Sequence, residues 1–192
     1  MDERLIVILL SSLAELIFSI AGLLQLRKLI KKKDKSGLSS WSWIFSTASA
    51  VAWMRYGFSI ELWPMVVATI LWLPISVGVL QFLVKPSKRV QVLFVILVLS
   101  VTFTVLIEKS GQLAGWVGVG IGIVSVSPQI RRAIIDKKLS GISVGSFAVN
   151  VFGNGITLVY GTILGSAPLI TSGVLFTVFN TFIAVQSHRK RM

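Results

Sequence analysis

Two stretches of the chain carry the same pattern, LLQLRKLIKKKDKSGLS at residues 23–39 and SPQIRRAIIDKKLSGIS at residues 127–143. A shift of 104 positions relates them, and the same shift aligns Tyr56 with Tyr160, Gly57 with Gly161 and Pro64 with Pro168. Over residues 25–82 the alignment needs no gap and contains twelve identities in 58 positions. Apolar composition alone does not readily match Gln, Arg, Ser-Gly, Tyr-Gly and Pro in one register, so the chain contains an internal duplication.

The composition argues against a soluble domain. Of 192 residues, 54% are apolar and only 14% are charged, whereas soluble domains carry about 25% charged residues. The net charge is +12, but the basic residues lie between apolar runs, so nucleic acid is not an expected partner. With no Cys and one His, neither a disulfide framework nor a metal site is expected, and no cofactor is expected.

Seven apolar segments are long enough to cross a bilayer as helices, which takes about 20 residues each. They are residues 5–26, 42–60, 63–84, 90–107, 113–133, 145–164 and 167–185. The runs are continuous rather than alternating, which favours helices over a β-barrel. The expected fold class is therefore an all-α polytopic membrane protein.

The basic residues predict the topology. Sixteen of the 19 Lys and Arg residues lie in four segments, 27–35, 85–89, 131–138 and 189–191, and the others are Arg4, Arg55 and Lys109. Basic loops stay cytoplasmic, and seven spans with an external N-terminus place all four segments on that side. We expect a protein of the cell membrane with a cytoplasmic C-terminus and anionic lipid headgroups near its basic loops.

Three spans reverse the direction of the chain, so two adjacent repeats would be inverted unless a further span separates them. The apolar segment 90–107 carries no repeat signal and is the expected linker. The predicted order is 3+1+3, with a first repeat at 1–84, a linker at 85–110 and a second repeat at 111–192. Parallel repeats place a solute site at their interface. One chain holds both repeats and could act as a monomer, and a homo-oligomer is also compatible.

Four tryptophans lie near the ends of predicted spans. Trp41 and Trp43 are at the inner end of the second span, and Trp63 and Trp116 are at outer ends. Their positions predict a belt at the membrane interfaces.

The motif Ser-Pro-Gln-Ile-Arg at 127–131, followed by Ser-Gly-Ile-Ser at 140–143, resembles a PQ-loop motif. The chain as a whole resembles the SWEET transporters, which are the duplicated form of the bacterial SemiSWEET half-transporters. The resemblance implies a sugar facilitator that works by alternating access, with the proline of each motif loosening its helix. Pro128 and Gln129 match the motif, while the first repeat has Gln25 preceded by Leu24.

The resemblance also implies where the pocket lies. The family places an aromatic residue three positions before the Tyr of Tyr-Gly, which is Trp53 here and Thr157 in the second repeat. The family's pocket Asn in the third helix of each repeat is absent, and Thr69 and Gly173 stand in its region.

Two amides within the spans are candidates to replace the missing pocket amides. These are Asn154 and Asn180, and the repeat mate of Asn180 is Ser76. The alternative for both amides is a hydrogen bond between helices.

Two charged residues lie within the spans. Glu15 is near the middle of the first span, where a carboxylate is a functional candidate. A low dielectric favours its neutral form, so Glu15 is a candidate proton site. A neutral Glu bonded between helices, or one facing a wet vestibule, is the alternative. Arg55 can snorkel to the outer surface or pair with Glu61 or Glu15.

Three functions follow from these patterns. The first is SWEET-like facilitated diffusion of a small sugar. The others are a proton-coupled PQ-loop carrier of amino acids or another small metabolite, and a non-transporting PQ-loop receptor. An enzyme is not expected, because the sequence shows no nucleophile–base set, paired carboxylates or phosphate-binding loop.

Overall fold

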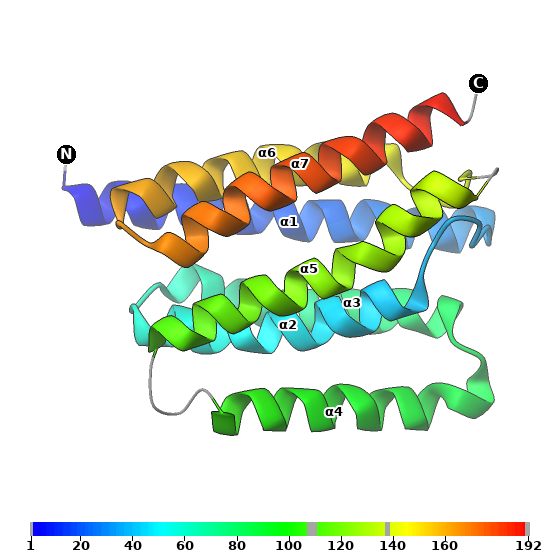
Figure 1. The fold of residues 1–192 in the computed structure, drawn as a ribbon, viewed down its shortest axis with the longest axis horizontal. Coiled ribbons are helices and arrows are strands. Elements are labelled where there is room, and N and C mark those ends of the chain that lie inside the picture. Colours follow the sequence, from blue (N-terminus) through cyan, green and yellow to red (C-terminus); the bar gives the residue numbers. More distant parts are fainter. Residues whose placement is uncertain (1, 107–110, 137–138, 191–192) are drawn as a thin grey trace.

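The part of the chain that the structure describes is a bundle of seven long helices (Figure 1). The structure is a computed structural model that describes residues 2–106, 111–136 and 139–190, without the side chains at 94, 98–99 and 101–106. The elements are α1 (Glu3–Lys32), α2 (Ser40–Ser59), α3 (Trp63–Leu83), the 3-10 turn η1 (Pro86–Lys88), α4 (Arg89–Leu106), α5 (Gly111–Ile135), α6 (Val144–Ile163) and α7 (Ala167–Arg189). The predicted end of the linker span at 107 and the basic residues Lys109, Lys137, Lys138 and Arg191 lie outside the described residues.

The predicted fold class is confirmed, and the protein is an all-helical polytopic membrane protein. By length and composition, α1, α3, α5 and α7 are each apolar enough to cross a membrane. Helices α2 and α6 have 20 residues each, and both contribute side chains to the interior of the bundle. Helix α1 continues beyond the predicted span to Lys32, and Asp2 caps its start by accepting the N–H of Arg4.

The six repeat helices form a closed ring. Around the ring the packed order is α1, α6, α7, α5, α2, α3 and back to α1. In each repeat the third helix lies between the other two, and the first helix of one repeat packs on the second helix of the other. This exchange of equivalent partners is what an approximate two-fold axis between the repeats requires. Helix α4 lies outside the ring and packs against α2 (Figure 1).

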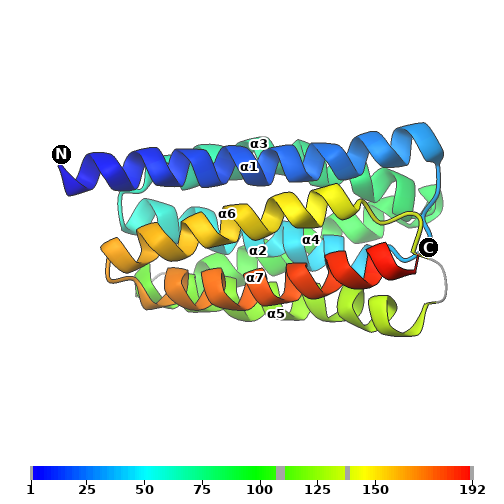
Figure 2. The ribbon, with the colours of Figure 1, turned by 90° about the horizontal axis from the view of Figure 1, so that it is seen from above.

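The connections show that the two repeats run parallel. The loops after α1, α3 and α5 lie at the same end of the bundle as the end of α7 (Figures 1 and 2). We call this the basic end, and we call the opposite end, which holds Asp2 and the turns at 60–62 and 164–166, the N-terminal end.

A glutamine in α1 joins the two repeats at the basic end. Gln25 Nε2 donates to the carbonyl of Gly141 at 3.1 Å, and Gln25 Oε1 accepts the N–H of Ser143 at 2.8 Å. The side chain is buried. It satisfies one backbone acceptor and one backbone donor in the loop of the other repeat, groups that are costly to leave unpaired when buried.

Gln129 in α5 makes the equivalent pair of bonds in the opposite direction. Its Nε2 donates to the carbonyl of Gly37 at 2.5 Å, and its Oε1 accepts the N–H of Ser39 at 3.2 Å. The repeat therefore explains both glutamines and both Ser-Gly pairs, because each of the two glutamines binds the Ser-Gly loop of the other repeat.

The glycines of these loops permit the close approach. Gly37 has φ of +77°, a conformation that residues with a side chain rarely adopt. A Cβ at Gly141 would lie 2.5 Å from the carbonyl oxygen of Ser36, so no side chain fits there without moving the backbone. Both loops depend on glycine for this interface.

The Tyr-Gly pairs form the turns at the N-terminal end. The N–H of Leu62 donates to the carbonyl of Gly57 at 2.8 Å, and the N–H of Ser166 donates to the carbonyl of Gly161 at 2.9 Å. A Cβ at Gly161 would lie 2.7 Å from the Cβ of Leu169. The glycine therefore lets the second and third helices of the repeat pack closely.

Candidate functional site: a cavity between the repeats

A cavity of about 310 Å³ occupies the centre of the ring, and all six repeat helices contribute to its lining. Leu38, Gln25 and Gln129 line it toward the basic end, and Met65 and Tyr160 line it toward the N-terminal end. The cavity thus lies between the glutamine contacts at the basic end and the Tyr-Gly turns at the N-terminal end.

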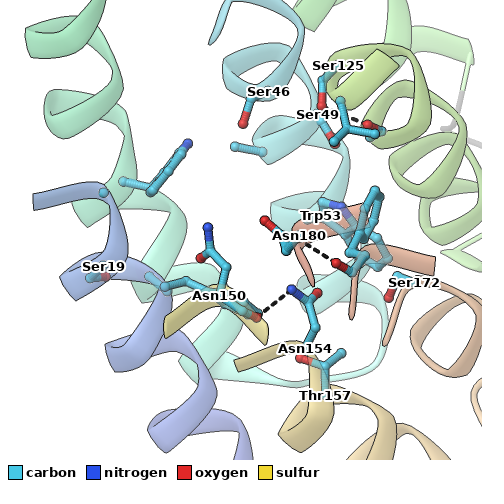
Figure 3. A pocket seen from close by; sticks show the side chains of 18 of the residues that line it. Ser19, Ser46, Ser49, Trp53, Ser125, Asn150, Asn154, Thr157, Ser172 and Asn180 are labelled. Atoms are coloured by element: carbon cyan, nitrogen blue, oxygen red, sulfur yellow. Dashed lines mark hydrogen bonds between the residues drawn. The ribbon is translucent and has the colours of Figure 1, made fainter. Parts of the chain in front are cut away.

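Five of the seven predicted substrate-binding residues line this cavity, namely Trp53, Thr69, Asn154, Thr157 and Asn180. Figure 3 shows Trp53 from α2, Asn154 and Thr157 from α6, and Asn180 from α7 around one space. Glu15, Gln25 and Gln129 line it as well.

The other predicted residues lie elsewhere. Gly173 faces α6, since a Cβ there would lie 2.8 Å from the backbone of Leu158. Ser76 is fully buried, and its hydroxyl donates to the carbonyl of Leu73 at 2.9 Å. Neither lines the cavity, so the sequence-based assignment of a solute contact to these two residues is withdrawn. Pro128 lies inside α5, also outside the lining.

The indole of Trp53 is held by contacts from two helices. A Cβ at Gly118 of α5 would lie 2.9 Å from the ring, so the absence of a side chain there makes room for the indole. Tyr56 packs edge-on against it, with ring centroids 6.0 Å apart and an interplanar angle of 76°. Ser49 ties the same two helices together by donating to the Gly118 carbonyl at 3.1 Å.

Among the residues that the structure describes, the two amides do not make the interhelical hydrogen bonds that were the alternative. Asn154 Nδ2 donates to the carbonyl of Asn150 at 2.7 Å, and Asn180 Nδ2 donates to the carbonyl of Phe176 at 2.6 Å, each within its own helix. One amide hydrogen and the side-chain oxygen of each residue remain for other partners. Asn150, which the predicted site omitted, also lines the cavity.

Sequence reasoning missed most of the cavity's hydroxyl groups. Seven serines line it: Ser19, Ser42, Ser46, Ser49, Ser125, Ser146 and Ser172. A signal was present in α2, where residues 42, 46, 49 and 53 follow the helical spacing of one face. In α6 the lining residues 146, 150, 154 and 157 follow the same spacing.

The prediction that Trp43 belongs to the interfacial belt is wrong. Trp43 lines the cavity and stacks on Trp72, with centroids 5.7 Å apart and planes inclined by 11°. Trp41, two residues away on the opposite face of α2, is exposed, as are Trp63 and Trp116.

The aromatic and amide residues divide between the repeats. The lining tryptophans, Trp43, Trp53 and Trp72, all come from the first repeat, and the lining asparagines, Asn150, Asn154 and Asn180, all come from the second. The first repeat therefore supplies the indole rings and the second supplies the asparagine amides, while both repeats contribute hydroxyl groups.

Glu15 is the one charged residue among the described lining residues, which include no Lys, Arg or His. Arg55 lies outside the lining. Its suggested pairing with Glu61 is wrong, because Glu61 pairs with Arg4 at 2.9 Å at the N-terminal end. The cavity therefore suits neutral or cationic solutes better than anionic ones.

A largely apolar cavity with converging hydroxyl, amide and carboxyl groups, enclosed by two parallel three-helix repeats, defines a membrane transporter for a small solute. Residues 6–84 match the family of sugar efflux transporters for intercellular exchange, and residues 110–170 match the PQ-loop repeat. The chain belongs to this SWEET and PQ-loop family. No curated protein and no solved structure matches it.

Proposed function

We propose that the protein carries a small sugar across the membrane by facilitated diffusion, without an ion coupled to it. The observation that carries this proposal is the lining, which combines indole rings with hydroxyl and amide groups. Sugar rings present apolar faces that stack on indoles and hydroxyls that bond to amides and serines. The match of residues 6–84 to sugar efflux transporters supports the same solute class.

The mechanism proposed is alternating access by rocking of the two repeats. The glutamine bonds join the repeats at the basic end. At the N-terminal end the hydroxyl of Tyr56 lies 2.6 Å from Oγ of Ser166, again across the two repeats. Releasing the contacts at one end while keeping those at the other end would open the cavity to one side of the membrane only. The rocking units are residues 1–84 and 111–192, with 85–110 as linker.

Pro128 favours bending of α5 in this mechanism, because proline removes one hydrogen bond donor from a helix. The first repeat has no proline at the equivalent position, but α3 contains Pro74 within its length. Each repeat therefore has one proline inside a helix, on different helices, and we expect the repeats to bend differently.

The proposed orientation places the basic end in the cytoplasm, with the N-terminus outside, in the cell membrane. Lys31, Lys32 and Lys33 would then meet the anionic headgroups of the inner leaflet. Because one chain contains both repeats, a monomer would suffice for transport.

Exchange of labelled glucose and sucrose in proteoliposomes without a pH gradient tests this function. Trp53→Ala should lower the exchange rate by at least about tenfold, because it removes the stacking surface. Trp116→Ala is the matched control, since this indole is exposed and outside the lining. Equal losses in both variants, or no loss in either, would contradict the assignment of the cavity.

A second candidate is a proton-coupled carrier of amino acids or another metabolite, which the position of Glu15 in the lining favours. In that case uptake requires an inward proton gradient and is lost in Glu15→Gln. Saturable binding with no flux of any solute would instead identify a receptor.

A further inference from the structure

Glu15 is a carboxyl group without a cationic protein partner in the described part of the chain. It is half-buried in α1 and lines the cavity. The two ion pairs described, Arg4–Glu61 and Arg132–Asp136, use other carboxylates. A carboxylate in a low-dielectric interior is costly unless a counter-charge pairs with it. A cationic group on the solute would supply that charge.

Tyr160 brings a second oxygen to the same region. Its side chain is fully buried, and its hydroxyl has no hydrogen-bond partner of ordinary geometry among the described residues. The repeat explains why. Tyr56, its mate, bonds to Ser166, but Leu62 occupies the position equivalent to Ser166 in the first repeat. The phenol oxygen of Tyr160 therefore lacks the bond that its mate makes, in a side chain that lines the cavity.

Thr157 adds a third oxygen. It lies three residues before Tyr160 on α6, and its hydroxyl donates to the carbonyl of Gly153 at 3.0 Å, so its oxygen can still accept. Helix α6 packs directly against α1, which carries Glu15. Glu15, Thr157 and Tyr160 all line the same cavity.

An ammonium group matches this set, because it has three N–H donors and one positive charge. The neighbouring aromatic residue Trp53 adds a surface that attracts cations. We propose that Glu15, Thr157 and Tyr160 form an amine-binding subsite, and that the preferred solute is a small sugar with a protonated amino group. This inference rests on the proposed function, since it specifies the solute of the same cavity.

Equilibrium binding of labelled glucosamine to the purified full-length protein tests the subsite, in a buffer near neutral pH, where much of the amine is protonated and the Glu15 carboxyl is not neutralised by added acid. N-acetylglucosamine is the matched neutral ligand, because acetylation removes the charge and keeps the ring. We expect glucosamine to bind at least about tenfold more tightly, the effect of one charged hydrogen-bonded pair. Equal affinities in the wild type would overturn the inference, even if no variant folds.

Variants then assign the preference to residues. Glu15→Gln should abolish the preference for glucosamine, and Tyr160→Phe should reduce it several-fold. Glu61→Gln is the control and should keep the preference, because Glu61 lies exposed at the N-terminal end. A preference that survives Glu15→Gln contradicts the subsite. So does glucose binding that requires sodium and Glu15, since the carboxylate would then hold a metal ion.

Flux measurements separate this inference from the proposed function. Glucose exchange without any preference for the amine would contradict the amine-binding subsite and support facilitated diffusion of a sugar. Glucosamine binding that depends on Glu15, with no exchange of any sugar, would support the amine-binding subsite and contradict the proposed transport function.

Discussion

The hydroxyl oxygens of Ser36 and Ser140 lie 3.0 Å apart, and the repeat makes these two residues equivalent. Equivalent residues can meet in this way only where the axis relating the two repeats passes between them. The contact therefore marks the approximate two-fold axis at the basic end. The glutamine bonds of Gln25 and Gln129 lie on either side of it as a reciprocal pair.

The close approach of the two Ser-Gly loops predicts that the stability of the fold depends strongly on Gly141. Gly141→Ala should destabilise the protein by about 1–3 kcal/mol, because the added Cβ would overlap the backbone of the other loop. The measurement is the unfolding temperature in detergent, followed by tryptophan fluorescence. Gly120→Ala is the control, since nothing lies within 4 Å of a Cβ there, and alanine favours a helix. A similar loss in both variants would show that the loops do not approach as described.

The reciprocal bonds predict matched losses for the two glutamines. Gln25→Ala and Gln129→Ala should each cost about 1–3 kcal/mol, because each leaves buried backbone groups unpaired. The side chain of Gln81 is exposed, so Gln81→Ala should leave the unfolding temperature unchanged. A large loss in only one of the two variants would contradict an equal role for both bonds.

The two tyrosines of the Tyr-Gly pairs should respond differently. Tyr56→Phe removes the bond to Ser166 and should lower the unfolding temperature by about 2–4 °C, which corresponds to about 1 kcal/mol. Tyr160→Phe removes a buried hydroxyl without a hydrogen bond and should leave stability equal or slightly higher. The reverse order would show that the bonds are assigned to the wrong tyrosine. Ser166→Ala should cost more than Tyr56→Phe, because the Ser166 hydroxyl also caps α7 by accepting the N–H of Leu169 at 3.3 Å.

Much of the fold could be predicted because its most specific residues serve the contacts between repeats. Gln25, Gln129 and the Ser-Gly pairs bind one another, so the duplication of the sequence reflects a duplicated interface. The basic residues predicted which loops lie at the same end of the bundle for a different reason, since charge resists transfer through the bilayer. The order of helices around the ring was not predictable, because it depends on packing between segments far apart in the chain.

The cavity was harder to predict than the fold, because the rotation of each helix decides which side chains face inward. Trp41 and Trp43 are two residues apart, yet one is exposed and the other lines the cavity. Ser76 was chosen as the repeat mate of Asn180, and Gly173 because it stands where the resembled family has a pocket Asn. Neither alignment ensures that a residue faces the same space as its counterpart. Serine hydroxyls carry little information alone, since many in this chain bond to carbonyls of their own helix.

Cross-linking of Ser36→Cys with Ser140→Cys tests the central claim most directly, because the chain has no other cysteine. If the repeats run parallel and rock about the cavity, oxidation should join the two positions, stop solute exchange in proteoliposomes, and be reversed by a reductant. Failure to cross-link, or labelling of the two cysteines from opposite sides of the membrane, would contradict the parallel arrangement. Full exchange by the cross-linked protein would contradict rocking that opens the basic end.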